Sequence, residues 1–535
     1  MKNKLRIQDK EFHENSYGTD RHLENWPLIY ILENEKQAYV GQSNRAIRRM
    51  AEHKSVKEKR PFRKVHFIYS EEFNQSVTLD YESKLIQLMA ADEHYILTNG
   101  NDGIADNNYY NKAYYDEYFP EVWEALRKKK IAVHTIDEIV NSDLFKYSPY
   151  KELNEGQRTA VEEILESIEL DEKKPILVNG MPGSGKTIVA VFLLKSLKDK
   201  TEYRGKQIGL VIPQTSLRRT LKNLFKHIHG LSAGDVIGPS DTVKKKYDIL
   251  LVDEAHRLHQ RKNIPNMGAH DANNKRLGLP KDGTELDWVL EQTDCPILFY
   301  DQKQVIGPSG IGHDLMVEKI FKKFEKRMAA YYTLYSQMRV QGGNDYIDYV
   351  SSLLNCRTEE KKTFDSYEFH IVDQFQSFQE LLLEKEESDG LSRMVAGYAW
   401  PWVSKKDKSK KDICIEGIYR RWNSRTENWV HSNTALDEVG CIHSIQGYDL
   451  NYAFVILGND ISYDNDLKKI VIKKDSYFDR NGKATATEKE LAEYIKNIYY
   501  VLLTRGIKGT FLYVCDTALK EYLSCLLYTS PSPRD

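Results

Sequence analysis

The sequence lacks the features of a disulfide-bonded, membrane-spanning or secreted protein. Only six of its 535 residues are cysteine, and they are scattered without a CxxC pair, which argues against disulfides and against a zinc site. No apolar run approaches the ~20 residues that cross a bilayer, and the N-terminus has no apolar centre like that of a signal peptide. We therefore expect a cytoplasmic protein that does not act at a membrane.

The sequence also lacks an excess of charge of one sign. Its formal net charge is −2, so the overall composition gives no indication of nucleic-acid binding. One segment differs, because residues 45–65 hold nine Lys or Arg side chains and two acidic ones. This segment has two interpretations, a solvated helix face or a patch that contacts phosphates.

A phosphate-binding loop is present in the middle of the chain. Residues 176–187 read ILVNGMPGSGKT and fit the pattern G-x-x-x-x-G-K-[ST] between an apolar strand and a helix. The glycines let backbone N–H groups surround phosphates at the N-terminus of that helix. We expect Lys186 to reach the β- and γ-phosphates of ATP and Thr187 to bind Mg²⁺. The nucleotide-binding residues expected from this loop are Gly180, Gly183, Ser184, Gly185, Lys186 and Thr187.

Two further strands are expected to bring polar side chains to the same sheet edge. The strand in YDILLVDEAHRL, residues 247–258, ends at Asp253, which suits Mg²⁺, and Glu254, which suits a general base that orients the attacking water. After the next strand, Gln304 is a candidate sensor of the γ-phosphate. The polar insertion at 257–283 is expected to form a loop.

In order along the chain, these segments resemble the motifs of superfamily 1 helicases. LNEGQ, which contains Gln157, resembles the adenine-reading motif. The later segments that continue the resemblance are LYSQMR with Arg339, IHSIQGYDLNYAFVI with Gln446 and Gly447, and YYVLLTRGIKGTFLYV with Arg505. The resemblance implies two RecA-like α/β domains with parallel sheets, ATP bound between them, and Arg339 and Arg505 beside the γ-phosphate.

Two aromatic segments narrow the resemblance. GYAWPW at 397–402 and EGIYRRWN at 416–423 look like the Schlafen-type group of superfamily 1 helicase domains in bacterial proteins. Tyr300 stands where a glycine is common in the third helicase motif. Whether the motor separates duplexes or only translocates therefore stays open.

The N-terminal part predicts a β-hairpin followed by helices. LIYIL and AYVG, joined by a polar turn, carry Tyr30 and Tyr39. A helix over QSNRAIRRMAEHK carries Arg49 and His53, and a second helix over 79–92 carries Glu82 near its start. Each tyrosine taken singly favours core packing over catalysis.

Taken together, residues 25–103 resemble the GIY-YIG endonuclease domain, a small α+β fold with a short antiparallel sheet and helices. The resemblance implies that Tyr30, Tyr39 or His53 assists deprotonation of water, that Arg49 holds the scissile phosphate, and that Glu82 binds Mg²⁺. Asn99 matches the late asparagine of the family. Leu28 stands where the first glycine is usual, so a module that binds nucleic acid without cutting it is an alternative.

The sequence therefore predicts an ATP-dependent helicase or translocase joined to a metal-dependent endonuclease. The partner is nucleic acid, with DNA favoured and RNA as an alternative, and the biological setting is phage defence, restriction or repair. The alternative is an NTP-driven switch with a binding module that does not cleave. The expected divisions are an N-terminal extension at 1–24, the nuclease-like domain at 25–103, a helical linker at 104–150, α/β domains at 151–325 and 326–523, and an adapter-like, non-native tail at 524–535.

Overall fold

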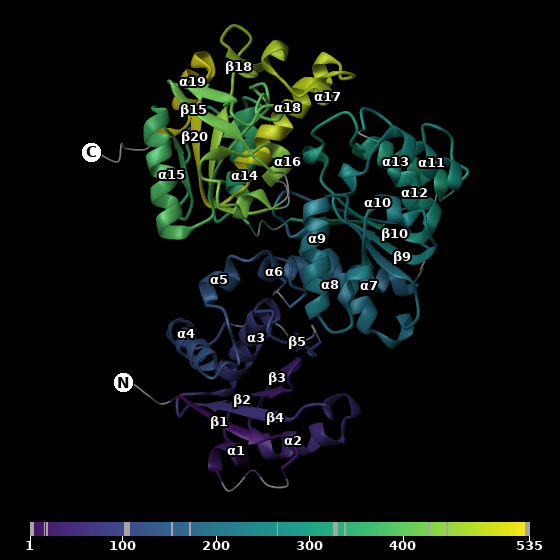
Figure 1. Ribbon diagram of the computed structural model, residues 1–535, viewed down its shortest axis with the longest axis vertical. Coiled ribbons are helices and arrows are strands. Elements are labelled where there is room, and N and C mark those ends of the chain that lie inside the picture. Colours follow the sequence, from purple (N-terminus) through teal and green to yellow (C-terminus); the bar gives the residue numbers. More distant parts are fainter. Residues whose placement is uncertain are drawn as a thin grey trace. The chain divides into compact units, whose positions relative to one another are not determined.

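The computed structural model describes most of the chain as two compact units. The described residues are 5–14, 17, 20–100, 108–150, 153–170, 173–264, 266–324, 330–335, 337, 339–425, 428–445 and 448–529. The first unit contains residues 1–154, 188–208 and 219–236, and the second contains 155–187, 209–218 and 237–535. Figure 1 labels the elements of both units. In the described part of the chain, no helix has the length and apolar character needed to cross a membrane.

A five-stranded sheet forms the centre of the N-terminal domain. Its strands are β1 (Arg6–Glu11), β2 (Leu28–Glu33), β3 (Gln37–Ser43), β4 (Lys64–Tyr69) and β5 (Ile96–Leu97). The strand order is β1-β4-β2-β3-β5, antiparallel except that β5 runs parallel to β3. The predicted hairpin is confirmed, and the Asn34 side chain closes its turn by accepting the backbone N–H groups of Lys36 and Gln37.

Six helices accompany this sheet: α1 (Arg21–Asn25), α2 (Ala46–Ser55), α3 (Gln75–Ala91), α4 (Lys112–Lys128), α5 (Ile136–Val140) and α6 (Asp143–Lys146). Helix α3 packs on β2 and β3, because its apolar residues face the sheet. The described part of the segment expected as a linker, 108–150, packs on α3 through α4, α5 and α6.

A buried carboxylate fastens this helical segment. Asp92, directly after α3, is 2% exposed and accepts the backbone N–H groups of Val133 at 2.9 Å and His134 at 2.8 Å. Nearby, the hydroxyl of Tyr81 donates to the carbonyl of Tyr115 at 2.6 Å. The start of the segment and the turn after α4 are thus both tied to α3.

The second unit contains two parallel sheets. The first has six strands: β6 (Ile176–Gly180), β7 (Ile208–Val211), β8 (Val236–Ile237), β9 (Tyr247–Val252), β10 (Thr293–Tyr300) and β11 (Ala330–Leu334), in the order β11-β6-β10-β9-β7-β8. Strand β10 pairs in parallel with both β6 and β9. The carboxyl ends of these three strands therefore meet at one edge, as ligand sites of α/β sheets require.

The helices that accompany the first parallel sheet include one the sequence did not predict. They are α7 (Glu155–Leu170), α8 (Lys186–Asp199), α9 (Thr215–Leu224), α10 (Pro239–Thr242), α11 (Met267–Arg276), α12 (Glu285–Gln292) and α13 (His313–Lys323). The loop expected at 257–283 was wrong over α11. Asn274 stabilises that helix, because its side chain donates to the carbonyl of Gly283 at 3.0 Å and accepts from the Trp288 indole at 2.6 Å.

The second parallel sheet has five strands: β12 (Glu368–Ile371), β13 (Ser392–Ala396), β17 (Leu450–Leu457), β20 (Gly506–Val514) and β21 (Tyr528–Thr529), in the order β13-β17-β20-β12-β21. Side chains alternate between its faces. On β17, Phe454 and Ile456 pack in one hydrophobic core with α15 (Phe375–Asp389), whereas Val455 packs in another with α18 (Glu488–Leu503). Two parallel sheets with helices confirm the predicted pair of RecA-like domains.

Further helices and short strands accompany the second sheet. They are α14 (Gly343–Leu354), α16 (Ile442–Ile445), α17 (Arg480–Lys483), α19 (Thr517–Ser524), a small sheet of β14 (Ile413–Ile415), β15 (Ile418–Trp422) and β16 (Glu438–Val439), and the hairpin β18 (Ile461–Asp464) and β19 (Lys469–Ile472). Within the tail expected to be non-native, Leu526 and Leu527 are buried. Residues 530–535 lie outside the described residues.

Replacing Asp92 by alanine should loosen the helical segment from α3. The backbone N–H groups of Val133 and His134 lose a charge-assisted acceptor, which should lower the free energy of unfolding by about 1–3 kcal/mol. Hydrogen exchange measured by mass spectrometry should become faster across α4 and α5. The matched control is Glu117→Ala, an exposed position on α4. Unchanged exchange in Asp92→Ala would show that the carboxylate does not fasten the segment.

Candidate active sites

The first candidate site gathers two tyrosines and a histidine on the N-terminal sheet. Tyr30 comes from β2, Tyr39 from β3 and His53 from α2. The hydroxyl of Tyr30 lies 2.8 Å from Nε2 of His53. The ring of Tyr39 is centred 5.4 Å from that of His53 and 6.4 Å from that of Tyr30. The structure therefore brings together three side chains whose roles the sequence predicted.

Gly41 makes room for this arrangement. It lies opposite Tyr30 in the β2–β3 pairing, and a Cβ atom there would collide with the tyrosine hydroxyl. Leu28, two residues before Tyr30 on the same face of β2, is fully buried in a core with Phe12 and Leu23. The hydrophobic core therefore accommodates the Leu28 side chain, which stands where the family usually has a glycine.

Arg49 and Glu82 complete the group. The Arg49 guanidinium lies beside Tyr30 and Tyr39 and pairs with Glu52 at 2.9 Å. Burial raises the pKa of the Glu82 carboxyl to about 7, although a backbone hydrogen bond from Gln42 and the charge of Arg49 act in the opposite direction. A desolvated carboxylate gains from a nearby cation, so Glu82 fits a role as Mg²⁺ ligand.

His53 is held neutral. Burial lowers its pKa to about 4, and the charges of Arg49 and Lys59 act in the same direction. The ring is therefore unprotonated at neutral pH and can accept a hydrogen bond.

Lys59 is a member of this site that sequence reasoning missed. Its ammonium group lies 2.9 Å from the centre of the Tyr39 ring, and burial lowers its pKa to about 7. In the sequence it was one cation among the nine of residues 45–65, with no spacing that set it apart.

Asn99 has a positioning role in this domain. Its side chain accepts the backbone N–H of Val40 at 3.0 Å and donates to the carbonyl of the same residue at 2.8 Å. This pair of hydrogen bonds fixes the stretch of β3 between Tyr39 and Gly41. Asn99 does so while 5% exposed.

The second candidate site is the loop between β6 and α8. Gly183 and Gly185 adopt φ values of +80° and +82°, a conformation that favours glycine. Lys186 Nζ donates to the carbonyls of Gly180 at 2.7 Å and Met181 at 3.2 Å. The sequence therefore forms the expected phosphate-binding loop at the N-terminus of α8. Ser184 lies in the same turn with its hydroxyl buried.

A buried carboxylate stands beside this loop. Thr187 Oγ1 donates to Asp253 Oδ2 at 2.7 Å. Asp253 is fully buried, and its Oδ1 has no hydrogen-bond partner among the described residues. Burial and the neighbouring Glu254 raise the pKa of Asp253. An orphaned carboxylate oxygen next to a threonine hydroxyl fits a Mg²⁺ site, with oxygen ligands from Thr187 and Asp253.

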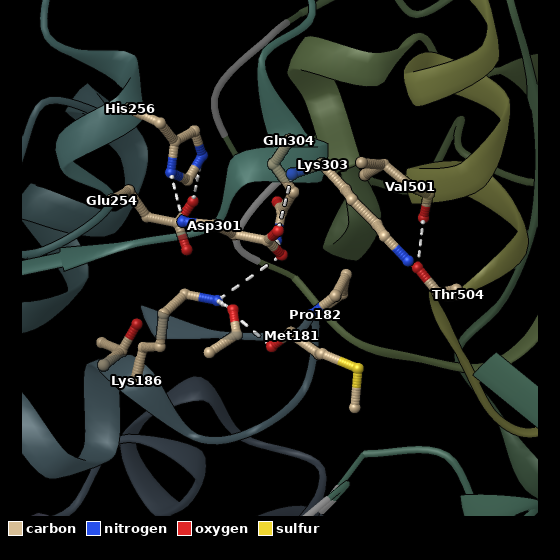
Figure 2. A network of polar contacts seen from close by, with 12 residues as sticks. Met181, Pro182, Lys186, Glu254, His256, Asp301, Lys303, Gln304, Val501 and Thr504 are labelled. Atoms are coloured by element: carbon tan, nitrogen blue, oxygen red, sulfur yellow. Dashed lines mark hydrogen bonds and ion pairs between the residues drawn. The ribbon is translucent and has the colours of Figure 1, made fainter. Parts of the chain in front are cut away.

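His256 orients the expected general base. Its Nδ1 accepts the backbone N–H of Asp301 at 3.1 Å, so its Nε2 carries the proton, and Nε2 lies 2.9 Å from Oε2 of Glu254. Although burial alone would raise it, the pKa of Glu254 is held well below its usual range by the contact with His256 and by the charges of Lys186 and Arg257. Glu254 itself adopts a left-handed φ of 51°, the kind of backbone strain that collects at functional sites. Figure 2 shows these side chains turned toward one another.

The third strand contributes a link to the loop. Asp301, directly after β10, accepts from the Gln304 side chain at 2.8 Å and lies 3.9 Å from Nζ of Lys186 (Figure 2). Gln304 is 3% exposed. The Gln157 side chain, from α7, donates to the carbonyl of Ser184 at 2.8 Å. Gln157 therefore contacts the phosphate loop itself, and Gln304 contacts Asp301, the carboxylate that lies near Lys186.

Arginines of the second α/β domain reach the same place. Gln337, two residues before Arg339, donates to the carbonyl of Pro182 in the loop, and Arg339 pairs with Asp449. Arg505 is 3% exposed, and burial, followed by the charge of Arg339, lowers its pKa to about 9. Gln446 and Gly447 lie outside the described residues.

Arg257 is a further cation that the sequence analysis did not select. Burial lowers the pKa of Arg257, whereas the charges of Glu254 and Asp253 act in the opposite direction. Its guanidinium lies 3.9 Å from Glu254 and donates to Gln214 at 3.1 Å. In the sequence Arg257 lies four residues after Asp253, and no helicase motif singled it out.

Two family models match the chain. The model described as Schlafen group 3, DNA/RNA helicase domain, matches residues 173–516, and the model of the GIY-YIG catalytic domain matches residues 27–95. The two matches fall on the two candidate sites.

Individual relatives extend this picture. Uncharacterized protein YPL245W of Saccharomyces cerevisiae is 26% identical over 401 residues, which are 66% of this chain and 85% of that protein. Replication restart protein PriA of Bacillus subtilis is 31% identical over 129 residues, which are 24% of this chain and 15% of PriA. Among solved structures, Pif1 helicase from Candida albicans is similar with a TM-score of 0.27 and 12% identity, covering 68% of this chain and 95% of that one. The family assignment rests on the helicase model, which spans more than half of the sequence.

Acidification should destabilise the tyrosine–histidine group through His53. Its folded pKa lies below the unfolded value, so this stability is fully present above pH ~6.5 and is lost as pH falls toward 4. Between pH 7 and pH 5 the loss should be about 2 kcal/mol. Hydrogen-exchange protection factors of β2 and β3 measure it. His53→Gln, which does not titrate, should show a smaller loss, and an equal loss would assign the effect to another group.

Proposed function

Because the chain belongs to the Schlafen group 3 DNA/RNA helicase family and carries a GIY-YIG catalytic domain, we propose that it is an ATP-driven helicase or translocase coupled to a Mg²⁺-dependent endonuclease. The proposed substrate is nucleic acid, with DNA favoured over RNA. The observation that carries the motor is the phosphate loop with the Thr187–Asp253 pair. The observation that carries the nuclease is the convergence of Tyr30, His53, Arg49 and Glu82.

In the motor, each residue has a defined task. The backbone of Gly183–Gly185 and the ammonium of Lys186 would hold the ATP phosphates, and Thr187 and Asp253 would hold Mg²⁺, which supplies charge neutralisation. Glu254, oriented by His256, would position and deprotonate the attacking water. Arg339 and Arg505 would stabilise the charge that develops on the γ-phosphate.

In the nuclease, Tyr30, Tyr39 or the neutral His53 would assist deprotonation of a water molecule at the scissile phosphate. The water oxygen forms a new P–O bond, the P–O bond to the departing sugar oxygen breaks, and that oxygen takes up a proton in place of the one that the water lost. Arg49 would neutralise the phosphate, and Glu82 would hold Mg²⁺, which supplies a Lewis acid.

A second candidate function is favoured by one observation. Leu28 replaces the first glycine of the family pattern and is fully buried. The alternative is a nucleic-acid-dependent NTPase whose N-terminal module binds without cutting. Strand binding and strand-stimulated ATPase activity without any cleavage would favour this alternative.

The biological setting is proposed from architecture alone. A motor joined to a nuclease suits the restriction of foreign DNA, including phage defence, or repair. All six cysteines are free, which is compatible with a reducing cytoplasm, so that compartment stays a prediction.

Lys186→Ala should abolish ATP hydrolysis. It removes the cation closest to the phosphates, and a loss of about 100-fold or more is expected for a group of this kind. ATPase rates are measured without nucleic acid and with single-stranded DNA, duplex DNA and RNA. The matched control is Lys198→Ala, at the other end of α8. Absence of stimulation by every nucleic acid in the wild-type chain would contradict the motor.

Glu82→Ala and Arg49→Ala should each abolish Mg²⁺-dependent cleavage of plasmid or branched DNA. The first removes the proposed metal ligand, and the second removes the phosphate contact, each worth about 10²-fold or more. Exposed positions of the same domain provide controls, Glu35→Ala in the β2–β3 turn and Arg48→Ala on α2. The nuclease site is wrong if both variants cut as well as the wild-type chain.

A further inference from the structure

The two aromatic segments singled out in the sequence form one cavity in the second α/β domain. GYAWPW contributes Tyr398, Trp400 and Trp402, and EGIYRRWN contributes Trp422. With Phe478 they line a cavity of about 640 Å³. The proposed ATP site does not use these residues. Their rings cluster, because those of Trp400 and Trp402 are centred 6.4 and 6.0 Å from that of Trp422.

The cavity is a built site rather than a gap between loops. Asp412, which is 8% exposed, accepts the backbone N–H groups of Ser404 at 2.7 Å and Trp422 at 2.9 Å. This carboxylate joins the loop after Trp402 to the end of β15. On the other side, the backbone N–H of Phe478 donates to the carbonyl of Tyr398 at 2.8 Å. The aromatic walls are therefore fixed before any ligand binds.

The charges around the cavity select an anion. Among the described residues, four cationic side chains line it, Lys405, Lys408, Arg421 and Arg425, against one carboxylate, that of Asp479. The ammonium of Lys405 lies 5.5 Å from the centre of the Trp402 ring. This excess of positive charge disfavours a methylated lysine or another cation, although aromatic cages can bind cations.

Two buried donors lack partners at the same place. The indole N–H of Trp422 and Nε of Arg421 have no hydrogen-bond partner among the described residues, and Trp422 is 1% exposed. A buried donor without an acceptor is costly, so a ligand that carries acceptor oxygens or ring nitrogens would be favoured. Aromatic faces, cations and unpaired donors together match a nucleotide, which has a base to stack and a phosphate to neutralise.

The cavity shares part of its wall with a second cavity. His443, Asp479 and Asn481 line both it and a second cavity of about 340 Å³, whose other walls include Arg257 and Gln304 of the motor motifs. His443 lies in α16, directly before the proposed nucleotide-binding pair at 446–447. The aromatic cavity therefore lies next to a cavity lined by residues of the motor motifs.

We propose that this aromatic cavity binds an unstacked nucleotide, its base against Trp400 and Trp402 and its phosphate near Lys405 and Arg425. This inference rests on the proposed function and adds to it a base-holding subsite on the second α/β domain. The subsite anchors the strand when the cleft between the sheets opens and closes.

The test measures binding of a fluorescein-labelled oligothymidylate of about 16 nucleotides to the full chain by anisotropy. Trp402→Ala should weaken binding roughly 5- to 150-fold, the range for losing one base stack, and Trp402→Phe should restore most of it. The matched control is Tyr419→Ala, an exposed aromatic residue on β15 that does not line the cavity. With an oligonucleotide of abasic sites, the penalty of Trp402→Ala should disappear.

A charge variant keeps the test independent of core packing. Lys405→Glu should weaken binding more than Lys406→Glu, because both side chains are exposed but only Lys405 lines the cavity. Thymidine monophosphate is also tested as a competitor of the labelled strand. If it displaces the strand, and if it quenches tryptophan fluorescence in the wild-type chain but not in Trp402→Ala, the ligand of the cavity is a free nucleotide. If the strand binds and thymidine monophosphate does not displace it, the ligand of the cavity is a nucleotide within a strand.

The inference is overturned if Trp402→Ala binds the normal and the abasic strand as the wild-type chain does, or if Lys405→Glu and Lys406→Glu are equal. In that case the proposed function survives, provided that nucleic acid still stimulates the ATPase. If the wild-type chain binds no strand and no nucleic acid stimulates its ATPase, both fail together.

Discussion

The motor depends on the parallel register of β6, β9 and β10. Ile297 lies opposite Ile176 on one side and opposite Leu251 on the other, so the three strands end at nearly the same height. The side chains that follow them are polar and are forced into a small volume. The hydrogen bond from Thr187 to Asp253 and the approach of Lys186 to Asp301 are direct consequences of that register.

The N-terminal site depends on a comparable constraint, the close pairing of β2 and β3. Tyr30 faces a glycine across this pairing, and only the missing Cβ lets its hydroxyl reach over the strand to His53. Asn99 holds the same stretch of β3 through the oxygen and the nitrogen of its side-chain amide, which accepts from and donates to the backbone of Val40. The chemistry of the site thus rests on backbone geometry set by residues that do not react.

Sequence reasoning could predict the parts of the molecule that local patterns specify. The phosphate loop, the strand before Asp253 and the β2–β3 hairpin each follow from residues adjacent in the chain. It could not predict residues whose role comes from long-range packing. Lys59 belongs to the nuclease group only because the turn after α2 places it over Tyr39. The sequence analysis did not select His256, because the hydrogen bond that it accepts from the backbone of Asp301 joins positions 45 residues apart.

Helix α11 shows the same limit for the fold. Its sequence is polar and predicts a loop, yet the buried Asn274 replaces the missing apolar face with hydrogen bonds to Gly283 and Trp288. A pattern search that scores hydrophobic periodicity does not detect a helix held by a buried amide. His53 shows the same limit, since it follows the charged Arg49 by one helical turn and yet the structure buries its side chain.

Both candidate sites collect desolvated groups whose charge is complementary to a ligand. Glu82 and Asp253 are carboxyls with raised pKa values, and Arg505 is a buried guanidinium with a lowered one. Burial without a counter-charge reduces the stability of a folded chain, so groups of this kind are retained where a ligand offsets the cost. Mg²⁺ would offset the carboxyls and phosphate would offset the arginine. The strained φ of Glu254 adds to the same pattern. Unfavourable burial therefore occurs at several residues that the motifs select, Glu82, Asp253 and Arg505 among them, and also at Lys59 and Arg257, which the motifs do not select.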